Sequence, residues 1–290
     1  KTPILFDPTS PKFMEAYLGI LHRNLEKLGC DFWWIDWQQG PYSRVPGMDP
    51  LWLLNHFHYL DHGRDGKVPL IFSRYAGPGS HRYPAGFSGD TVVTWESLAF
   101  QPEFTATASN IGYGWWSHDI GGHIRGYRDD ELVTRWVQLG VFSPIMRLHS
   151  TSSHWMSKEP WLYRKEYMFA MSEFLRFRHR LVPFLYTRNI ICSEEDEPLV
   201  QPMYWEYPEC EAAYSVPNQY LFGSEVLVAP IVQPREGTNL ASVKAWLPPS
   251  QRHVDIFTGT VYDGNRDITL YRSLDEYPVL AHEGSIITLD

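Results

Sequence analysis

Residues that could do chemistry stand at the ends of strand-like runs in this sequence, and the clearest is Asp36. The run 30–36, CDFWWID, is apolar and aromatic and ends in that carboxylate. A carboxylate at the end of a buried strand is costly unless it is paired or hydrogen-bonded, and aromatic walls beside it suit a sugar ring. Because structural ion pairs also perturb carboxylates, an Asp36 that only caps a loop or pairs with an arginine is an equal alternative on this run alone.

Four other strand-like runs end in a polar side chain, at Arg74, Asp90, Asp119 and His149. The runs alternate with helical patterns, which predicts a parallel sheet with helical crossovers. In a closed barrel of this kind the carboxyl ends of the strands share one face. These side chains are therefore expected to converge with Asp36, and their convergence is a stronger signal of a site than any one of them.

The elements that must position these residues are marked by caps and by hydrophobic spacing. Ser10-Pro11 and Asp49-Pro50 are typical helix starts, and Gly29 is expected to end the first helix. The second helix is expected to bury one face, made of Leu51, Leu54, Phe57 and Leu60. The other expected elements are strands over 67–74, 83–90, 112–119 and 141–148, and helices after Asp90, over 130–139 and over 163–187. In the last of these helices the basic residues 176–180 are expected to form a solvated face.

After about residue 190 the pattern changes to short alternating segments separated by Gly and Pro turns. Such segments predict an antiparallel β domain. The sequence therefore indicates a domain of alternating strands and helices followed by an antiparallel β domain, with a boundary near residues 190–215.

Composition limits the classes of partner. The 290 residues are 43% hydrophobic and 15% aromatic, a surplus of rings that favours a site which stacks on them. The net charge of −9 argues against a nucleic-acid partner, and no apolar run approaches the ~20 residues of a membrane helix. The 3 cysteines fit neither a disulfide framework nor a metal motif, and they mildly favour a reducing compartment such as the cytoplasm. Because the chain begins at Lys1, we expect it to be a piece of a longer polypeptide.

The motifs at the strand ends resemble those of glycoside hydrolase family 31. The matching segments are 34–36 (WID), 72–74 (FSR), 87–90 (FSGD), 119–122 (DIGG) and 135–149 (RWVQLGVFSPIMRLH). Their order and spacing fit the family, and residues 219–230 look like the β-sandwich that follows its barrel. The resemblance implies a (β/α)8 TIM barrel, whose C-terminal part is residues 1–190 and whose first strands are missing from this chain, and then an antiparallel β-sandwich over residues 191–290.

The same resemblance implies a retaining α-glycoside hydrolase, by default an α-glucosidase, that needs no metal and no cofactor. Asp36 would be the nucleophile and Asp90 the acid/base, and Arg74 would keep Asp36 ionised. An oligosaccharide or glycoside is the implied substrate. The expected sugar-contact residues are Arg74, His149, Trp34, Trp37, Phe87, Asp119, Trp116 and His123.

Three departures from the family pattern leave the sugar open. The family's Asp-Met-Asn-Glu is DWQQ at 36–39, its Trp before Ser-Gly-Asp is Phe87, and its Phe after Asp-Ile-Gly-Gly is His123. α-Galactosides and N-acetyl-α-galactosaminides are alternative substrates for the same mechanism. The family's nucleophile lies on the fourth barrel strand, so we expect the missing N-terminal part of the same polypeptide to complete the barrel. Without that part, the segment is expected to aggregate or dimerise.

Several alternatives remain beside these roles. Asp90 could cap the helix that follows it, Arg74 could be an ordinary buried ion-pair partner, and His149 and the tryptophans could be core residues. His118, Asp119 and His123 are metal-ligand types, although their spacing matches no ligand motif. The alternative of another class is a non-catalytic carbohydrate-binding relative.

Overall fold

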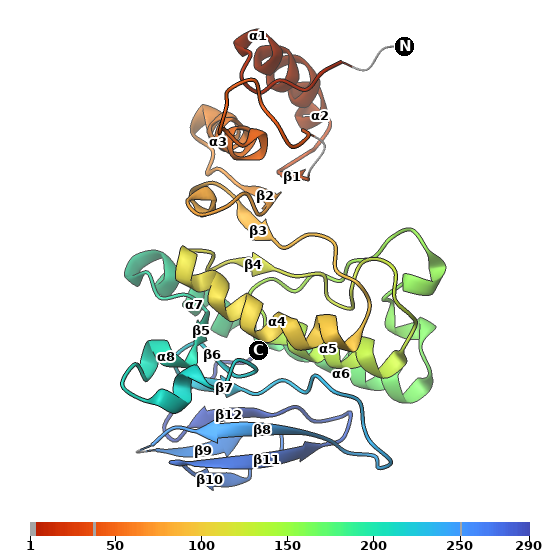
Figure 1. Ribbon diagram of the computed structural model, residues 1–290, viewed down its shortest axis with the longest axis vertical. Helices are drawn as coiled ribbons and strands as arrows, with labels where there is room; N and C mark the ends of the chain where they lie inside the picture. Colours follow the sequence, from red (N-terminus) through yellow and green to blue (C-terminus); the bar gives the residue numbers. More distant parts are fainter. Residues whose placement is uncertain (1–3, 37–38, 250) are drawn as a thin grey trace. The chain divides into compact units, whose positions relative to one another are not determined.

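The computed structural model describes residues 4–36, 39–249 and 251–290 (Figure 1). The chain divides into two compact units, Lys1–Gly89 with Ile111–Tyr113, and Asp90–Asn110 with Gly114–Asp290. Helix α4 (Trp95–Ala108) packs against strands of the C-terminal β domain and so belongs to the second unit. The expected domains 1–190 and 191–290 divide the chain at a different place and stay a prediction.

The first unit begins with the helix that the Ser10-Pro11 pair predicts. The Ser10 side chain accepts a hydrogen bond from the Phe13 N–H, and the helix then runs through α1 (Pro11–Met14), a π-helical stretch η1 (Glu15–His22) and α2 (Arg23–Lys27). Helix α3 (Pro50–His62) starts at the predicted cap, where the Asp49 side chain accepts two backbone N–H bonds. Leu51 and Leu54 of α3 are buried as expected, but Leu60 is 57% exposed, and His58 and His62 are buried.

Three parallel strands follow the order β1–β2–β3 in the first unit: β1 (Trp33–Ile35), β2 (Ile71–Arg74) and β3 (Ala85–Phe87). The registers Ile35↔Ser73 and Arg74↔Phe87 bring the carboxyl ends of the strands to one edge. The core of this unit is apolar and includes Met14, Leu18, Ile35, Leu51, Leu54 and Ile71. This sheet therefore carries the ends of three predicted motifs side by side.

The barrel part of the second unit contains β4 (Trp116–Ser117) and the helices α4, α5 (Asp130–Val141), α6 (Lys165–Arg180) and α7 (Val182–Glu195). Two expectations were wrong here. The expected helix 163–187 is two helices, because Pro183 lies in the first turn of α7 and has no N–H to continue α6. The expected strand 141–148 is not a strand, since α5 extends to Val141 and only an isolated bridge joins Leu148 to Ile120.

The basic middle of the 163–187 segment is only partly solvated. The guanidinium of Arg178 donates hydrogen bonds to the carbonyl oxygens of Val141, Ser143 and Pro144, at 2.6–2.8 Å. These carbonyls belong to the last residue of α5 and to the residues just after it, where a helix leaves acceptors without intrahelical donors. Arg178 therefore ties α6 to the end of α5 and does not belong to a solvated face.

The C-terminal β domain is antiparallel, as the sequence predicts. Its strands are β5 (Val200–Pro202), β6 (Tyr220–Phe222), β7 (Val226–Val228), β8 (Ala241–Leu247), β9 (Arg252–Asp255), β10 (Val261–Asp263), β11 (Arg266–Arg272) and β12 (Val279–His282). They form one sheet of order β10-β9-β12-β7-β6-β5 and a pair β11-β8. Leu227 and Leu280 of the larger sheet share a buried cluster with Leu247 and Leu270 of the pair, which is the sandwich arrangement.

Short helical turns complete the described structure: η2 (Arg64–Gly66), η3 (Ser80–Arg82), η4 (Ser109–Ile111), η5 (His154–Met156), η6 (Pro160–Leu162), α8 (Met203–Glu206) and η7 (Glu211–Tyr214). Among the described helices, none is both long and apolar enough to cross a membrane.

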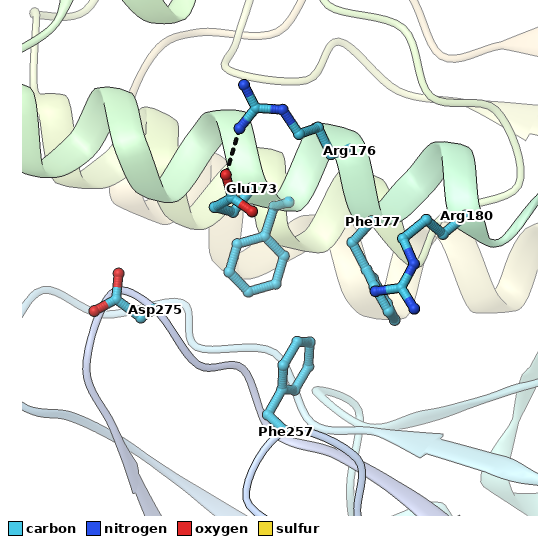
Figure 2. A pocket seen from close by; sticks show the side chains of 7 residues that line it. Glu173, Arg176, Phe177, Arg180, Phe257 and Asp275 are labelled. Carbon is cyan, nitrogen blue, oxygen red and sulfur yellow. Dashed lines mark hydrogen bonds and ion pairs between the residues drawn. The ribbon is translucent and has the colours of Figure 1, made fainter. Parts of the chain in front are cut away.

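A cavity of 240 Å³ lies where α6 meets the loop after β9 (Figure 2). Figure 2 shows Phe257 pointing from that loop toward the helix that carries Phe177. The Phe257 ring lies 5.5 Å from the ring of Phe174 and 5.6 Å from that of Phe177, and the Asp255 side chain fixes the loop by accepting the Phe257 N–H at 2.9 Å. We interpret this cavity as a packing contact between α6 and the C-terminal β domain within the second unit.

Replacing Phe257 with alanine is expected to destabilise the protein by about 2 kcal/mol, because it removes a half-buried ring from two aromatic contacts. Thermal and urea unfolding of the purified full-length protein would measure the loss. Phe257→Leu keeps most of the apolar volume and should cost less. Equal stability of the alanine variant and the unsubstituted protein would contradict this role.

Candidate active site

Asp36 and Arg74 form an ion pair at the carboxyl edge of the parallel sheet. Asp36 follows β1 directly and Arg74 ends β2, so the parallel pairing of these strands brings the two side chains together. The Arg74 Nε donates to the Asp36 Oδ1 at 2.7 Å, and both side chains are partly accessible. The pair holds the Asp36 carboxylate beside a permanent positive charge.

The glycine of the 87–90 motif makes room for this arginine. Gly89 has a φ of +91°, and a Cβ there would overlap the Arg74 guanidinium. The Phe87 ring lies 5.8 Å from the same guanidinium and 5.9 Å, edge to face, from the ring of Trp34. The Phe87 ring therefore lies against the arginine of the ion pair, and Trp34 packs on Phe87.

The aromatic candidates differ in how accessible they are. Trp34 is 51% exposed and is available as a wall of a binding site. Trp116 is only 2% exposed and packs edge to face on Phe104 at 5.5 Å. This burial favours the core alternative for Trp116 over the expected sugar contact, and Phe87 is buried in the same way. The predicted contact Trp37 lies outside the described residues.

Asp90 follows the 87–89 segment and does not cap the next helix. Helix α4 is capped by Thr94, whose Oγ1 accepts the Ser97 N–H at 3.2 Å. The Asp90 side chain is 40% exposed. The capping alternative for Asp90 was therefore wrong, and its carboxyl is accessible.

Asp119 is buried and linked to two neighbours. Its Oδ1 accepts a bond from the Arg147 guanidinium at 2.7 Å, and its Oδ2 accepts the Thr91 N–H at 3.1 Å. Burial raises the pKa of Asp119, and the charge of Arg147 opposes this shift. Arg147 also donates to the Ser117 Oγ at 3.1 Å. Asp119 thus holds the backbone next to Asp90 and is itself held by Arg147, a residue that was not predicted as part of the site.

His118, next to Asp119, is a core residue. Its Nδ1 accepts the Trp136 indole N–H at 3.1 Å, so the neutral ring carries its proton on Nε2, 2.9 Å from the Ser143 Oγ. Burial lowers the pKa of His118 to about 3. Because both ring nitrogens are engaged in the core, His118 is not a metal ligand.

Carboxylate oxygens and a ring nitrogen of Asp90, Asp119 and His123 lie within 4.8 Å of one another, a grouping that could hold a metal ion. Both oxygens of Asp119 already have donors, and Arg147 supplies a positive charge, so an ion is not needed to explain the cluster. The expectation that the site needs no metal stays a prediction. His149 closes this cluster, since its ring stacks on that of His123 at 4.3 Å.

Lys158 interacts with the charge of Asp119 and was also not predicted from the sequence. It is buried, its side chain crosses the space where Gly121 would have a Cβ, and its Nζ donates to the Met156 carbonyl oxygen at 2.5 Å. Burial lowers the pKa of Lys158 to about 8, and the charge of Asp119 opposes the shift. The glycine at 121 hinted at such a close approach, but its partner lies 37 positions away in an irregular segment.

Comparison with known proteins identifies the family. The model of the glycosyl hydrolases family 31 TIM-barrel domain matches residues 2–188, and that of the family 31 C-terminal domain matches residues 196–287. The chain is 30% identical over 225 residues to alpha-glucosidase 2 of Bacillus thermoamyloliquefaciens (78% of this chain, 28% of that protein). It is 29% identical over 304 residues to an alpha-xylosidase of Emericella nidulans (98% of this chain, 38% of that protein).

The fold is also that of solved family members. A family 31 dextranase of Flavobacterium johnsoniae, complexed with isomaltotriose, has a TM-score of 0.84 to this chain at 25% identity, over 97% of this chain and 37% of that one. The chain spans 28% and 38% of the two curated relatives. With the motifs at 34–36, 72–74, 87–90 and 119–122 in family order, the chain belongs to glycoside hydrolase family 31 and carries its TIM-barrel and C-terminal β-sandwich domains.

Proposed function

We propose that the protein containing this chain is a retaining α-glycoside hydrolase that acts by double displacement. Asp36 attacks the anomeric carbon while Asp90 gives its proton to the leaving glycosidic oxygen, and the bond between that oxygen and the anomeric carbon breaks. Water then attacks the glycosyl ester and gives a proton to Asp90, which frees the Asp36 carboxylate. The observation that carries the proposal is the 2.7 Å Asp36–Arg74 pair at the edge of the sheet, in the family's own motif.

A fluorinated glycosyl donor tests this assignment, because its slow turnover lets the glycosyl ester accumulate. The full-length protein would be incubated with the donor, digested and analysed by mass spectrometry. We expect the label on the peptide that contains Asp36, and on that residue. A label on any other carboxylate would exclude Asp36 as the nucleophile.

For the substrate we propose an α-linked glycoside, with an α-glucoside as the default. Curated relatives of this chain include α-glucosidases and α-xylosidases, which supports an α-glucoside as the default substrate. The sequence departures at Gln38, Gln39, Phe87 and His123 keep α-galactosides and N-acetyl-α-galactosaminides as alternatives. Rates of the full-length protein on a panel of aryl α-glycosides would decide among them.

We also propose that further residues of the same polypeptide cover the N-terminal helices of this chain. Large apolar side chains are exposed on this segment, among them Ile4, Leu5, Ile20, Leu21 and Leu28. An apolar surface of this kind favours association in water. The isolated 290-residue segment is therefore expected to aggregate or dimerise in light scattering after gel filtration. A monodisperse monomer that unfolds cooperatively would count against this proposal.

A further inference from the structure

Backbone hydrogen bonds join the segment that contains His123 to the residue directly after Asp90. The His123 N–H donates to the Thr91 carbonyl oxygen at 2.7 Å, and the Ile124 N–H donates to the same oxygen at 3.1 Å. Gly122 makes this approach possible, because its φ is +74° and a Cβ there would lie 2.9 Å from the Cα of Val93. The backbone therefore places the His123 ring next to Asp90.

Stacking holds one face of the ring, which lies on His149 with an interplanar angle of 18°. The backbone of the same residue is held as well, because the His123 carbonyl oxygen accepts the Thr151 N–H at 3.0 Å. Its Nδ1 is buried and has no hydrogen-bond partner among the described residues. A buried N–H without an acceptor is costly, so the neutral ring carries its proton on Nε2.

That Nε2 lies 3.6 Å from the Asp90 Oδ1. The distance is longer than a hydrogen bond, but catalytic contacts often tighten only when substrate is bound. Two further titratable groups among the described residues lie near the ring: Asp119, which forms an ion pair with Arg147, and His149. His123 therefore offers an N–H donor to Asp90, which a phenylalanine at this position does not.

We infer that His123 is a positioning residue that orients the Asp90 carboxyl toward the leaving-group oxygen. The inference rests on the proposed function of Asp90 as the acid/base. When Asp90 gives up its proton it becomes a carboxylate, and the Nε2–H of His123 donates to that carboxylate. The contact is therefore stronger after proton transfer than before it, which is the condition for lowering the barrier.

Rates on substrates with different leaving groups test the contact between His123 and Asp90. Aryl glycosides with a good leaving group, such as dinitrophenolate, need little help from an acid, whereas alkyl or unsubstituted phenyl glycosides need it fully. In the full-length protein, His123→Phe is expected to lower kcat/KM for the phenyl glycoside by about 10- to 100-fold and to change it little for the dinitrophenyl glycoside. His123→Gln keeps an N–H donor and should recover part of the loss, and His154→Phe, at an exposed histidine, should change neither rate.

Three results would overturn the inference. These are equal losses on both substrates for His123→Phe, no loss on either, or no difference between the Phe and Gln variants. If His123→Phe does not fold, the ratio of the two rates in His123→Gln still decides, because a structural defect lowers both rates together. Failure of the proposed function has a different signature, since the fluorinated donor would then label no residue or a residue other than Asp36.

Discussion

Asp36→Ala is expected to lower kcat on aryl α-glycosides by roughly 10⁴-fold or more, because it removes the atom that bonds to the sugar. Added azide can occupy the space of the lost carboxylate and attack the anomeric carbon once, so the product should be the inverted β-glycosyl azide. The rate and the product would be measured in the full-length protein by chromatography and NMR.

Asp90→Ala is the matched comparison. Its glycosyl ester on Asp36 still forms from an activated substrate, and azide then attacks that ester, so the product should be the α-glycosyl azide with retained configuration. Opposite stereochemistry in the two variants assigns the two roles separately. If both variants gave the same anomer, or if neither lost activity, the double-displacement assignment would be wrong.

Acidification from pH 7 to pH 5 is expected to destabilise the protein strongly. His58, His118 and His253 are buried, and burial lowers their pKa values to about 3, about 3 and about 4. In the unfolded chain a histidine binds a proton near pH 6.5. The stability that these neutral histidines contribute is therefore complete above pH 6.5 and is lost as the pH falls, because the unfolded state then binds protons that the folded state does not.

Each such histidine changes the free energy of unfolding by about 1.4 kcal/mol per pH unit once its unfolded form is protonated. Burial raises the pKa of Asp119, so that group works in the opposite direction at lower pH. Urea unfolding of the full-length protein at pH 7.5, 6.5 and 5.5 would measure the slope. His118→Gln is the matched control, since an amide can accept from Trp136 and donate to Ser143 without titrating. That variant should lose about 1.4 kcal/mol per pH unit less, and an unchanged slope would contradict the assignment.

Capping residues in the sequence correctly predicted where the first helix and α3 begin. Ser10 and Asp49 cap their helices because a short polar side chain can reach the free N–H groups of the first turn. The end of α5 was misjudged for a related reason. The segment 141–148 is apolar and buried at its start, and a short apolar run does not distinguish a strand from the end of a buried helix. In the structure that segment is held by Arg178, which donates to the carbonyl oxygens of Val141, Ser143 and Pro144, and by the Ile145 N–H, which donates to the Trp116 carbonyl oxygen.

The sequence alone determined the family, the order of β-rich and helical elements, and the pairing of Asp36 with Arg74. This was possible because adjacent parallel strands bring their carboxyl ends to one edge, so a motif at each strand end predicts a neighbour. The sequence did not determine which aromatic residues are accessible, and it did not relate Asp119 to Arg147 or Gly121 to Lys158. Those contacts join irregular segments 28 and 37 residues apart. The tertiary structure alone decided that His123 lies beside the Asp90 carboxyl. The two segments meet through one isolated parallel bridge, Val92 to Ile124, and through hydrogen bonds to Thr91, and so short a pairing leaves no periodic pattern in the sequence.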